Sequence, residues 1–343
     1  MGDTVIEIIA GGDVDKNKVV NDGKYPIYAN SQNGDGIVGY YDDYYRIKGP
    51  AVTVTGRGEV GFAKARETDF TPVVRLLAIR SNHNHYFLEN SINLHRVIVE
   101  STGVPQLTAP QLSLYRIFFP RDIQEENQIG TFFSTLDQQI TLHQRKLDKL
   151  KHVKQAYLSE MFPAEGERVP KRRFPGFTDA WELRKLGEVV DVCSGRDYKH
   201  LETGSIPVYG TGGYMLSVSE ALSKNEDAIG IGRKGTIDSP YILRAPFWTV
   251  DTLFYCIPQN DFTLEFAYSV FQNINWKSMD ESTGVPSLSK NGINNVRVLT
   301  PKIQEQSAIG TFFSTLDRQI TLHQRKLEKL KNLKKALLNE LFV

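Results

Sequence analysis

The chain has 343 residues, which is long for a single hydrophobic core and predicts at least two domains. Its 40% hydrophobic and 24% charged residues, with a net charge of +1, are typical of a folded water-soluble protein. No apolar run approaches the ~18 residues needed to span a bilayer, which argues against a membrane protein. The first residues lack a secretory signal, and Cys193 and Cys256 fit no metal-binding spacing. We therefore expect a cytoplasmic protein whose two cysteines are buried thiols.

Residues 1–108 are expected to form a first β-rich module. Short runs rich in β-branched and aromatic residues at 51–56, 72–79 and 96–100 are separated by clusters of Gly, Asn and Asp. The segment 30–45 is rich in amides, glycines and tyrosines and is predicted to be an exposed loop. Such a loop suits an adaptable recognition surface, although a plain connecting loop fits the same composition.

Residues 109–163 carry the strongest structural signal, which is that of a long amphipathic helix. No Pro or Gly interrupts 131–162, and a rise of ~1.5 Å per residue predicts a rod of roughly 50 Å. The apolar positions alternate in spacings of four and three, which is the pattern of a coiled-coil seam. A histidine within the seam is expected to set the helix register rather than to bind a ligand. The seam positions are Ile129, Phe133, Leu136, Ile140, His143, Leu147 and Leu150.

The same helix occurs a second time in the chain. Twenty of the 22 positions in 129–150 are identical in 309–330, and the sequence STGVP precedes both helices, at 101–105 and 282–286. The chain is therefore a tandem repeat of a variable module followed by a nearly invariant helix. The second seam consists of Ile309, Phe313, Leu316, Ile320, His323, Leu327 and Leu330.

Each apolar seam requires a partner, because burying one large apolar side chain is worth roughly 1.5–3 kcal/mol. The simplest partner is the other helix of the same chain. A helix dimer between separate chains is the alternative, and it would favour open-ended association.

The second half of the chain begins with a polar segment, 164–181, that contains Pro and Gly and is predicted to link two domains. A second β-rich module extends to residue 289, with strands predicted at 228–232 and 252–258. Residues 290–343 are predicted to contain the second copy of the helix.

The sequence contains no recognisable catalytic constellation. The segment GIGRKGT at 230–236 lacks the spacing of a phosphate-binding loop, and GTGGYM at 210–215 departs from the dinucleotide fingerprint at its last position. The signatures of zinc proteases, nucleophile elbows and adenine methyltransferases are missing from the sequence too. His83 and His85 are expected to lie in a solvated turn rather than in a metal site. These observations favour a binding subunit over an enzyme.

The charge distribution lacks the broad basic face that is usual for a nucleic-acid-binding module. Both modules carry slightly more acidic than basic residues, so any nucleic-acid surface must come from small clusters. Solvated strand ends are the alternative interpretation of the same cations. The candidate DNA-binding residues are Arg57, Lys64, Arg66, Asn30 and Gln32 in the first module, and Arg233, Lys234 and Arg244 in the second.

Several segments together resemble the specificity subunit of a type I restriction–modification system. They are the paired STGVP sequences, the lead-in FPGFTDAWELRKLGEVV before the second module, the pieces IPVYGTGG and GRKGT, and the two LDxQITLHQRKLxKLK helices. Their order, spacing and duplication agree over essentially the whole chain. One departure is that the lead-in at 174–188 has no counterpart ahead of Val5.

The resemblance implies an α+β fold in which two β-rich target-recognition domains are separated by two long antiparallel coiled-coil helices, in a pseudo-two-fold tandem repeat. It implies that each domain reads one half of a bipartite double-stranded DNA site, while the helices set the spacing and dock two modification subunits. Those subunits would bind S-adenosylmethionine and methylate adenine N6, and restriction subunits would use ATP and Mg. This chain would hold no cofactor or metal and would supply no catalytic residue. The competing classes are a repeat adaptor that binds proteins through its tyrosine-rich loops, and an enzyme with unrecognised motifs, such as a nuclease.

Overall fold

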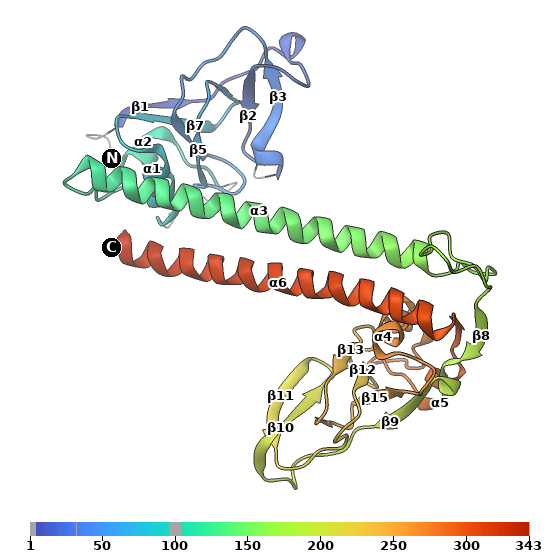
Figure 1. Ribbon diagram of the computed structural model, residues 1–343. Coiled ribbons are helices and arrows are strands. Elements are labelled where there is room, and N and C mark those ends of the chain that lie inside the picture. The colour runs from blue at the N-terminus through green and yellow to red at the C-terminus, as the bar shows by residue number, and fades with distance from the viewer. Residues whose placement is uncertain (1–4, 32, 96–104, 343) are drawn as a thin grey trace. The chain divides into compact units, whose positions relative to one another are not determined.

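The chain forms two compact units, each of which combines one β-rich module with parts of both long helices (Figure 1). The computed structural model describes residues 5–31, 33–95 and 105–342. Unit 1 contains residues 1–144 and 325–343, and unit 2 contains residues 145–324. Each unit therefore contains parts of both long helices. The four consecutive segments predicted from the sequence, two modules and two helices, do not correspond to these units.

Two sheets form the β-rich part of unit 1. Its elements are β1 (Val5–Ala10), η1 (Lys16–Lys18), β2 (Tyr25–Tyr28), η2 (Asn33–Gly36), β3 (Ile37–Tyr41), β4 (Ala51–Thr55), β5 (Ala63–Arg66), β6 (Thr71–Pro72), β7 (Leu76–Ser81), α1 (His85–Asn93) and α2 (Ala109–Ser113). The larger sheet is antiparallel, with the order β1-β7-β4-β5, and its interior strand β4 is buried at all five residues. The smaller sheet has the order β3-β2-β6, and β2 runs parallel to β6.

Unit 2 repeats this topology. Its elements are β8 (Glu182–Lys185), η3 (Leu186–Glu188), β9 (Val190–Ser194), β10 (Thr203–Gly210), β11 (Gly213–Val218), β12 (Ala228–Gly232), β13 (Tyr241–Leu243), β14 (Trp248–Thr249), β15 (Leu253–Pro258), α4 (Leu264–Asn273), η4 (Trp276–Met279), α5 (Lys290–Asn295) and β16 (Arg297–Thr300). The orders β9-β15-β12-β13 and β11-β10-β14 match the two sheets of unit 1 strand for strand. An additional antiparallel pair, β8 with β16, has no equivalent among the described strands of unit 1.

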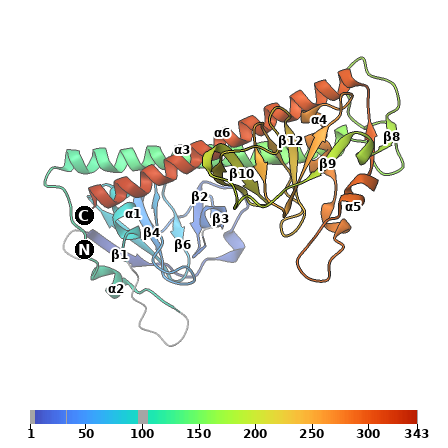
Figure 2. The same cartoon turned by 90° about the horizontal axis from the view of Figure 1, so that it is seen from below.

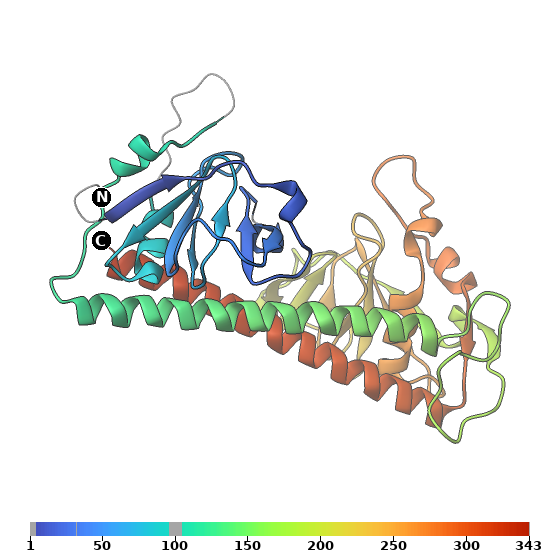
Figure 3. The ribbon, with the colours of Figure 1, turned by 90° about the horizontal axis from the view of Figure 1, so that it is seen from above.

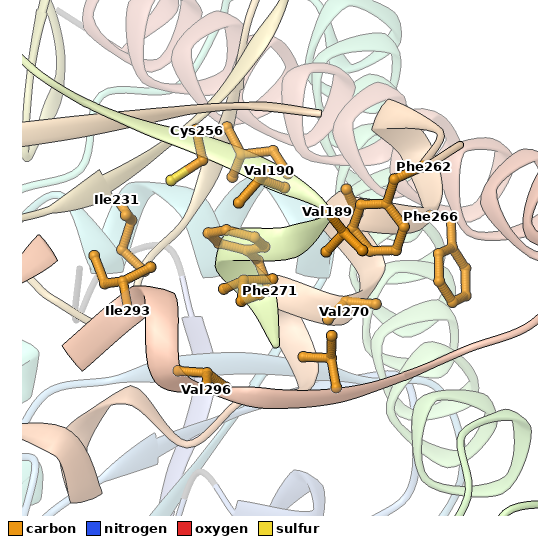
Figure 4. Close-up of a cluster of buried hydrophobic side chains, with 14 of the residues drawn as sticks. Val189, Val190, Ile231, Cys256, Phe262, Phe266, Val270, Phe271, Ile293 and Val296 are labelled. Atoms are coloured by element: carbon orange, nitrogen blue, oxygen red, sulfur yellow. The ribbon is translucent and has the colours of Figure 1, made fainter. Parts of the chain in front are cut away.

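The core of unit 2 is an aromatic layer between α4 and the larger sheet. Phe266 and Phe271 of α4 are fully buried, and Figure 4 shows them among aliphatic side chains such as Val190 of β9 and Ile231 of β12. Each buried side chain of this size is worth about 1.5–3 kcal/mol relative to exposure. Phe87 in α1 occupies the equivalent place in unit 1 and is 1% exposed. Figure 2 shows α1 and α4 each lying between the sheet of its own unit and a long helix.

The long helices begin earlier than the uninterrupted runs of the sequence predict. They are α3 (Ile123–Met161) and α6 (Ile303–Leu341), with 39 residues each. At ~1.5 Å per residue each is roughly 58 Å long. Gly130 and Gly310 lie inside the helices, where a Cβ on Gly310 would come within 2.8 Å of the backbone nitrogen of Phe266, and one on Gly130 within 2.1 Å of Asn84 Oδ1. Glycine therefore allows each long helix to approach the first turn of α4 or α1 closely.

Within unit 1 the two long helices pack in opposite directions. Lys334 Nζ donates to Asp137 Oδ1 over 2.6 Å, and the rings of Phe133 and Phe342 lie 5.6 Å apart. Residue numbers thus fall along α3 while they rise along α6, which is the antiparallel arrangement (Figure 3). The two side chains of this ion pair are partly buried, at 26% and 29% exposed.

Unit 2 has the same antiparallel packing. Lys154 of α3 forms an ion pair with Asp317 of α6, and the rings of Tyr157 and Phe312 lie 5.0 Å apart. Asp317 repeats the sequence position of Asp137 in unit 1, just as the two lysines repeat each other. The duplicated sequence therefore produces two equivalent ion pairs, one in each unit.

Every seam position of the two helices is at least partly covered. The fully buried ones are Phe133, Leu136, His143, Leu147, Ile309, Phe313 and Leu327, and the partly buried ones are Ile129, Ile140, Leu150, Leu316, Ile320, His323 and Leu330. Leu142 and Leu322 are equally apolar but lie off the seam, and they are 43% and 57% exposed. The leucines that follow the spacing of four and three are therefore covered, and these two leucines outside it are exposed.

The predictions for the segment 30–45 and for Cys193 differ from the structure. The segment 30–45 is not a single exposed loop, because it contains η2 and β3, and Tyr41 at the end of β3 is 3% exposed. Cys256 is buried as predicted, but Cys193 is only partly buried; both are free thiols. The predicted strand at 96–100 lies outside the described residues.

The prediction of a solvated turn at the paired histidines is wrong. His83 Nδ1 lies 2.8 Å from Oε2 of Glu126, which is 1% exposed, and the imidazole stacks on Phe119 with the ring centres 3.8 Å apart. His85 Nε2 lies 2.8 Å from Glu67 Oε1. Both histidines therefore join α1 to other parts of unit 1 through contacts that are distant in sequence.

The polar segment at 164–181 is an ordered part of unit 2. Arg173 donates two hydrogen bonds to the carboxylate of Glu305, over 2.6 and 2.7 Å, and that carboxylate raises the pKa of the Arg173 guanidinium. Trp181, at the end of the segment, is 1% exposed and packs edge to face on Phe162 and Phe266.

Candidate nucleic-acid interface

In both units an exposed cationic turn follows an interior strand of the larger sheet. Arg57 comes shortly after β4 in the sequence Gly-Arg-Gly, and Arg233 and Lys234 come directly after β12 in the sequence Gly-Arg-Lys-Gly. All three side chains are exposed. The repeat therefore places a Gly-Arg pair at the end of equivalent strands, which is where a rigid sheet can present side chains to a ligand.

The turn of unit 2 is held by backbone hydrogen bonds from two directions. The amides of Arg233 and Lys234 donate to the carbonyl of Thr252 over 2.8 and 3.3 Å, and the amide of Gly235 donates to the carbonyl of Pro286 over 2.8 Å. Gly235 has a φ of 98°, which glycine adopts without the steric cost that a side chain would bring. The two cations are thus carried by a well-defined backbone.

The second STGVP sequence forms a closed loop beside this turn. Asp280 Oδ1 accepts hydrogen bonds from the amides of Ser287 and Ser282, over 2.9 and 3.0 Å, and these bonds lower the pKa of the Asp280 carboxyl. Ser287 also forms a β-bridge with Lys234, and Val285 at the tip of the loop is 55% exposed. In the sequence, STGVP indicates the repeat but was not predicted to lie beside the cationic turn. The signal that could have indicated this place is that STGVP is identical in two modules whose sequences otherwise differ.

The turn of unit 1 is held by the side-chain amide of Asn30. Its Oδ1 accepts from the amide of Gly56 over 2.9 Å, and its Nδ2 donates to the carbonyl of Val74 over 3.1 Å. The amide of Leu107 donates to the carbonyl of Gly56 over 3.0 Å, so the segment after the first STGVP copy also contacts this turn. Since both polar groups of Asn30 are engaged, we assign it to holding the turn. The other amide candidate, Gln32, lies outside the described residues.

Arg66 is buried in the sheet of unit 1. It is 7% exposed, its Nη1 pairs with Asp35 Oδ2 over 2.8 Å, and its Nε donates to Thr53 Oγ1 over 3.1 Å. The guanidinium also lies over the ring of Tyr28, 3.7 Å from its centre. Arg66 therefore stabilises the packing of unit 1, and its buried guanidinium already has partners within the unit.

Lys64 and Arg244 reach solvent but have acidic neighbours. Lys64 Nζ lies 3.6 Å from Oε1 of Glu89, a carboxyl whose pKa is raised by burial and lowered to a smaller extent by the lysine. The two outer nitrogens of Arg244 lie 2.6 Å from Asp227 Oδ2 and 3.5 Å from Glu265 Oε1. A DNA phosphate would have to compete with these carboxylates, so both residues are weaker candidates than the cations of the turns.

The cations of the turns have no carboxylate partner among the residues that the structure describes. Within residues 5–31, 33–95 and 105–342, Arg57 and Lys234 form no ion pair, and the Arg233 guanidinium donates to the backbone carbonyl of Asp251 over 3.4 Å. Arg75 is a further exposed cation that sequence reasoning missed. It has a φ of 70°, and its carbonyl packs against Gly56, where an added Cβ would lie 2.2 Å away. Nothing in the surrounding apolar run marks this break between β6 and β7.

Two other kinds of site are not found in the part of the chain that the structure describes. None of its helices combines the length and apolar character required to cross a membrane. No three His, Cys, Asp or Glu side chains gather closely enough there to hold a metal ion.

Two like β-rich modules, each with a cationic turn and each packed on long antiparallel helices, define a two-module binding protein on a helical scaffold. The family model of the type I restriction modification DNA specificity domain matches residues 3–152 and 178–332. The chain therefore belongs to this family.

Individual relatives agree with the family. A type I specificity subunit of Mycoplasma pneumoniae is 29% identical over 116 residues, which are 33% of this chain and 31% of that protein. The specificity subunit of the type I restriction enzyme MjaVIII of Methanocaldococcus jannaschii is 20% identical over 285 residues, covering 70% of this chain and 64% of that protein. The chain thus spans less than two thirds of either relative. The crystal structure of the type I restriction–modification S subunit from M. genitalium shares the fold, with a TM-score of 0.77 at 17% identity, covering 100% of this chain and 94% of that one.

Proposed function

We propose that the chain is the DNA sequence-specificity subunit of a type I restriction–modification complex and that each unit binds one half of a bipartite double-stranded site. The observation that carries this proposal is the repetition of an exposed cationic turn beside the STGVP-derived segment, in two units whose sheets match strand for strand. The catalytic steps belong to partner subunits, and this chain contributes no catalytic residue.

The exposed side chains at the two turns differ, which suits two unlike half-sites. The turn of unit 1 carries Arg57 with Arg75 nearby, whereas the turn of unit 2 carries Arg233 and Lys234. An arginine can donate two parallel hydrogen bonds to O6 and N7 of guanine, which is worth about 1–3 kcal/mol of discrimination against other bases. A lysine acts as a point charge and suits a phosphate.

The low net charge predicts that the chain alone holds DNA weakly. Non-specific affinity comes mainly from the counterions that phosphates release when cations replace them, and this chain has a net charge of only +1. We infer that docked modification subunits supply much of the affinity of the complex, while the two turns supply the selectivity.

The two long helices offer equivalent docking surfaces for those subunits. Residues that are identical in both copies remain exposed although the pairing of the helices does not use them. They are Thr131, Thr135, Leu142, Arg145, Lys146 and Lys149 of α3, with Thr311, Thr315, Leu322, Arg325, Lys326 and Lys329 of α6. Surface positions that stay identical while the modules diverge indicate a shared constraint. Two copies of one modification subunit would satisfy it.

The same helices fix the spacing of the half-sites. A helix of roughly 58 Å exceeds the ~34 Å of one DNA turn, so two major-groove contacts can be held apart by it. In this complex the modification subunits bind S-adenosylmethionine and methylate adenine N6, and restriction subunits use ATP and Mg. The chain itself holds no cofactor, and the complex acts in the cytoplasm.

Methylome sequencing of a host that expresses the chain with its modification subunits tests this proposal. We expect one bipartite motif with a constant spacer, methylated on both strands. Arg233→Ala should relax only the half read by unit 2, and Arg57→Ala only the other half, while Arg244→Ala, which has carboxylate partners, serves as the matched control.

Three results would contradict the proposal. The first is equal relaxation of both halves by either substitution. The second is a chain that gives no sequence-specific methylation although it assembles with its partners, which would favour a protein-binding adaptor. The third is metal-dependent DNA cleavage by the purified chain alone, which would favour a nuclease.

A further inference from the structure

The cationic turns of the two units have a neighbour in common. Lys234 forms a β-bridge with Ser287, and Arg57 forms the same bridge with Gln106. Ser287 and Gln106 are the residues that directly follow the two STGVP sequences. Both units therefore place a cation of the turn beside the end of an identical sequence. Parts that are alike in both units suit contacts that both half-sites offer, such as those to phosphates.

The tip of the hairpin in the smaller sheet also lies at this turn, and it differs between the units. β10 pairs in parallel with β14, as β2 does with β6, so the two hairpins hold the same place in the fold. The strand pairing leaves residues 210–213 as the tip in unit 2 and residues 29–36 as the tip in unit 1. The two tips thus differ in length as well as in sequence.

Each tip lies close to the cationic turn of its own unit. A Cβ added to Gly235 would lie 3.9 Å from Thr211 Oγ1, and one added to Gly58 would lie 3.8 Å from the carbonyl oxygen of Asn30. Gly235 and Gly58 directly follow the cations Lys234 and Arg57. A ligand that contacts the turn is therefore within reach of the side chains at the tip.

The hairpin of unit 2 presents two large side chains beside its tip. Tyr214 is 64% exposed and Met215 is 50% exposed, although neighbouring residues in a strand point to opposite faces. Both faces of the hairpin are thus open to solvent at this point. The hydroxyl of Tyr241 in β13 donates to the carbonyl of Gly210 over 2.5 Å, so the tip is fixed to the larger sheet. Large exposed apolar groups on a fixed backbone beside cations indicate a binding surface.

The tip of unit 1 has a different chemistry. The exposed side chains in the described part of 29–36 are polar, and they belong to Ser31, Asn33 and Asp35. Two unlike half-sites require some part of the two units to differ. The tips differ in length, sequence and polarity, whereas the cation of the turn and STGVP recur.

We propose that Tyr214 and Met215 read the half-site of unit 2 through non-polar contact with a thymine. The C5-methyl group of thymine is the apolar group that base edges present in the major groove, and apolar side chains recognise it there. This inference rests on the proposed function, in which each unit contacts one half-site. It adds a second reading element to the cationic turn of unit 2.

Replacing thymine by deoxyuridine tests the contact, because the exchange removes the methyl group and keeps the hydrogen-bonding groups of the base. The probe is a duplex with the methylated motif, bound by the chain together with its modification subunits, and each thymine of the unit 2 half is replaced in turn. We expect the wild type to bind about 4-fold more weakly when one particular thymine is replaced, the loss expected for exposing one buried methyl group. Met215→Ala and Tyr214→Ala should bind the two duplexes with more nearly equal affinity.

Two further variants serve as controls. Tyr214→Phe keeps the ring and should discriminate between the duplexes as the wild type does, because the contact is non-polar. Leu183→Ala removes another large side chain of unit 2, which is 50% exposed and lies on β8, a strand that pairs with β16. It should leave both the affinity and the discrimination unchanged. Equal melting temperatures of all variants and the wild type show that the exposed positions do not alter the fold.

Methylome sequencing separates failure of this inference from failure of the proposed function. The double variant Tyr214→Ala with Met215→Ala should accept other bases at the thymine position and leave the unit 1 half and the spacer unchanged. A bipartite wild-type motif that the double variant reproduces without relaxation overturns this inference alone. So does a loss of affinity that is equal for thymine and deoxyuridine, since the side chains would then act by another contact. A wild-type chain that directs no sequence-specific methylation overturns the proposed function, and this inference with it.

Discussion

Leu136→Asp places a carboxylate in the buried seam between α3 and α6 of unit 1, where Leu136 is 7% exposed. Removing a buried leucine side chain costs about 2–5 kcal/mol, because transfer energy is lost and a cavity is left. A buried polar group without a partner adds about 1–3 kcal/mol. The sum, roughly 3–8 kcal/mol, is a large part of the ~5–15 kcal/mol by which domains of this kind are stable. We therefore expect unit 1 to unfold or aggregate near room temperature.

The matched control is Leu142→Asp, which changes the same residue type on the same helix. Leu142 lies off the seam and is 43% exposed, so its replacement should change the free energy of unfolding by no more than about 1 kcal/mol. Urea unfolding followed by circular dichroism measures both variants. If Leu136→Asp and Leu142→Asp lower the unfolding midpoint by the same amount, the seam does not hold the two helices together and the reasoning is refuted.

Arg66→Ala should lower the stability of unit 1 by about 1–3 kcal/mol, because it removes a buried guanidinium with several partners, and should leave the methylated motif unchanged in the molecules that fold. Lys234→Ala should leave the melting temperature unchanged and should reduce the salt dependence of DNA binding by about one phosphate contact. For Glu89, burial raises the pKa above the ordinary 4.5, so its contribution to stability is full below pH 4.5 and is lost as the pH rises through the folded-state value. Glu89→Gln should therefore gain stability relative to the wild type as the pH rises above 4.5, and a difference between the two proteins that stays constant in urea titrations at rising pH would contradict this.

The long helices could be predicted from sequence because their signals are local. A spacing of four and three over more than 20 residues, occurring twice, indicates both the helix and the buried face. The starts of the helices could not be found in this way, since Gly130 and Gly310 look like breaks. In the structure they are tolerated because α1 and α4 approach the helices there, and that contact joins segments far apart in the chain.

The candidate interface could be predicted only in part, for the same reason. Arg57 and Lys234 follow strands whose sequences are easily recognised, and both prove to be exposed. Arg66 carries the same charge and also ends a strand, but it is buried and pairs with Asp35, which lies 31 residues away in the sequence. No local pattern separates these cases, because the partner of a charged side chain is set by tertiary packing. The role of Asn30 in holding the turn of unit 1 is hidden from sequence in the same way.

The most direct test of the central claim, that each unit reads one half of the site, is to place the second module in both positions. In this chain residues 1–108 are replaced by a second copy of 178–289, and both long helices are kept. Single-molecule methylation sequencing with the modification subunits should show a motif made of two inverted copies of the unit 2 half-site, with the original spacer length. A motif that still contains both original halves, or two copies in direct repeat, would contradict the account.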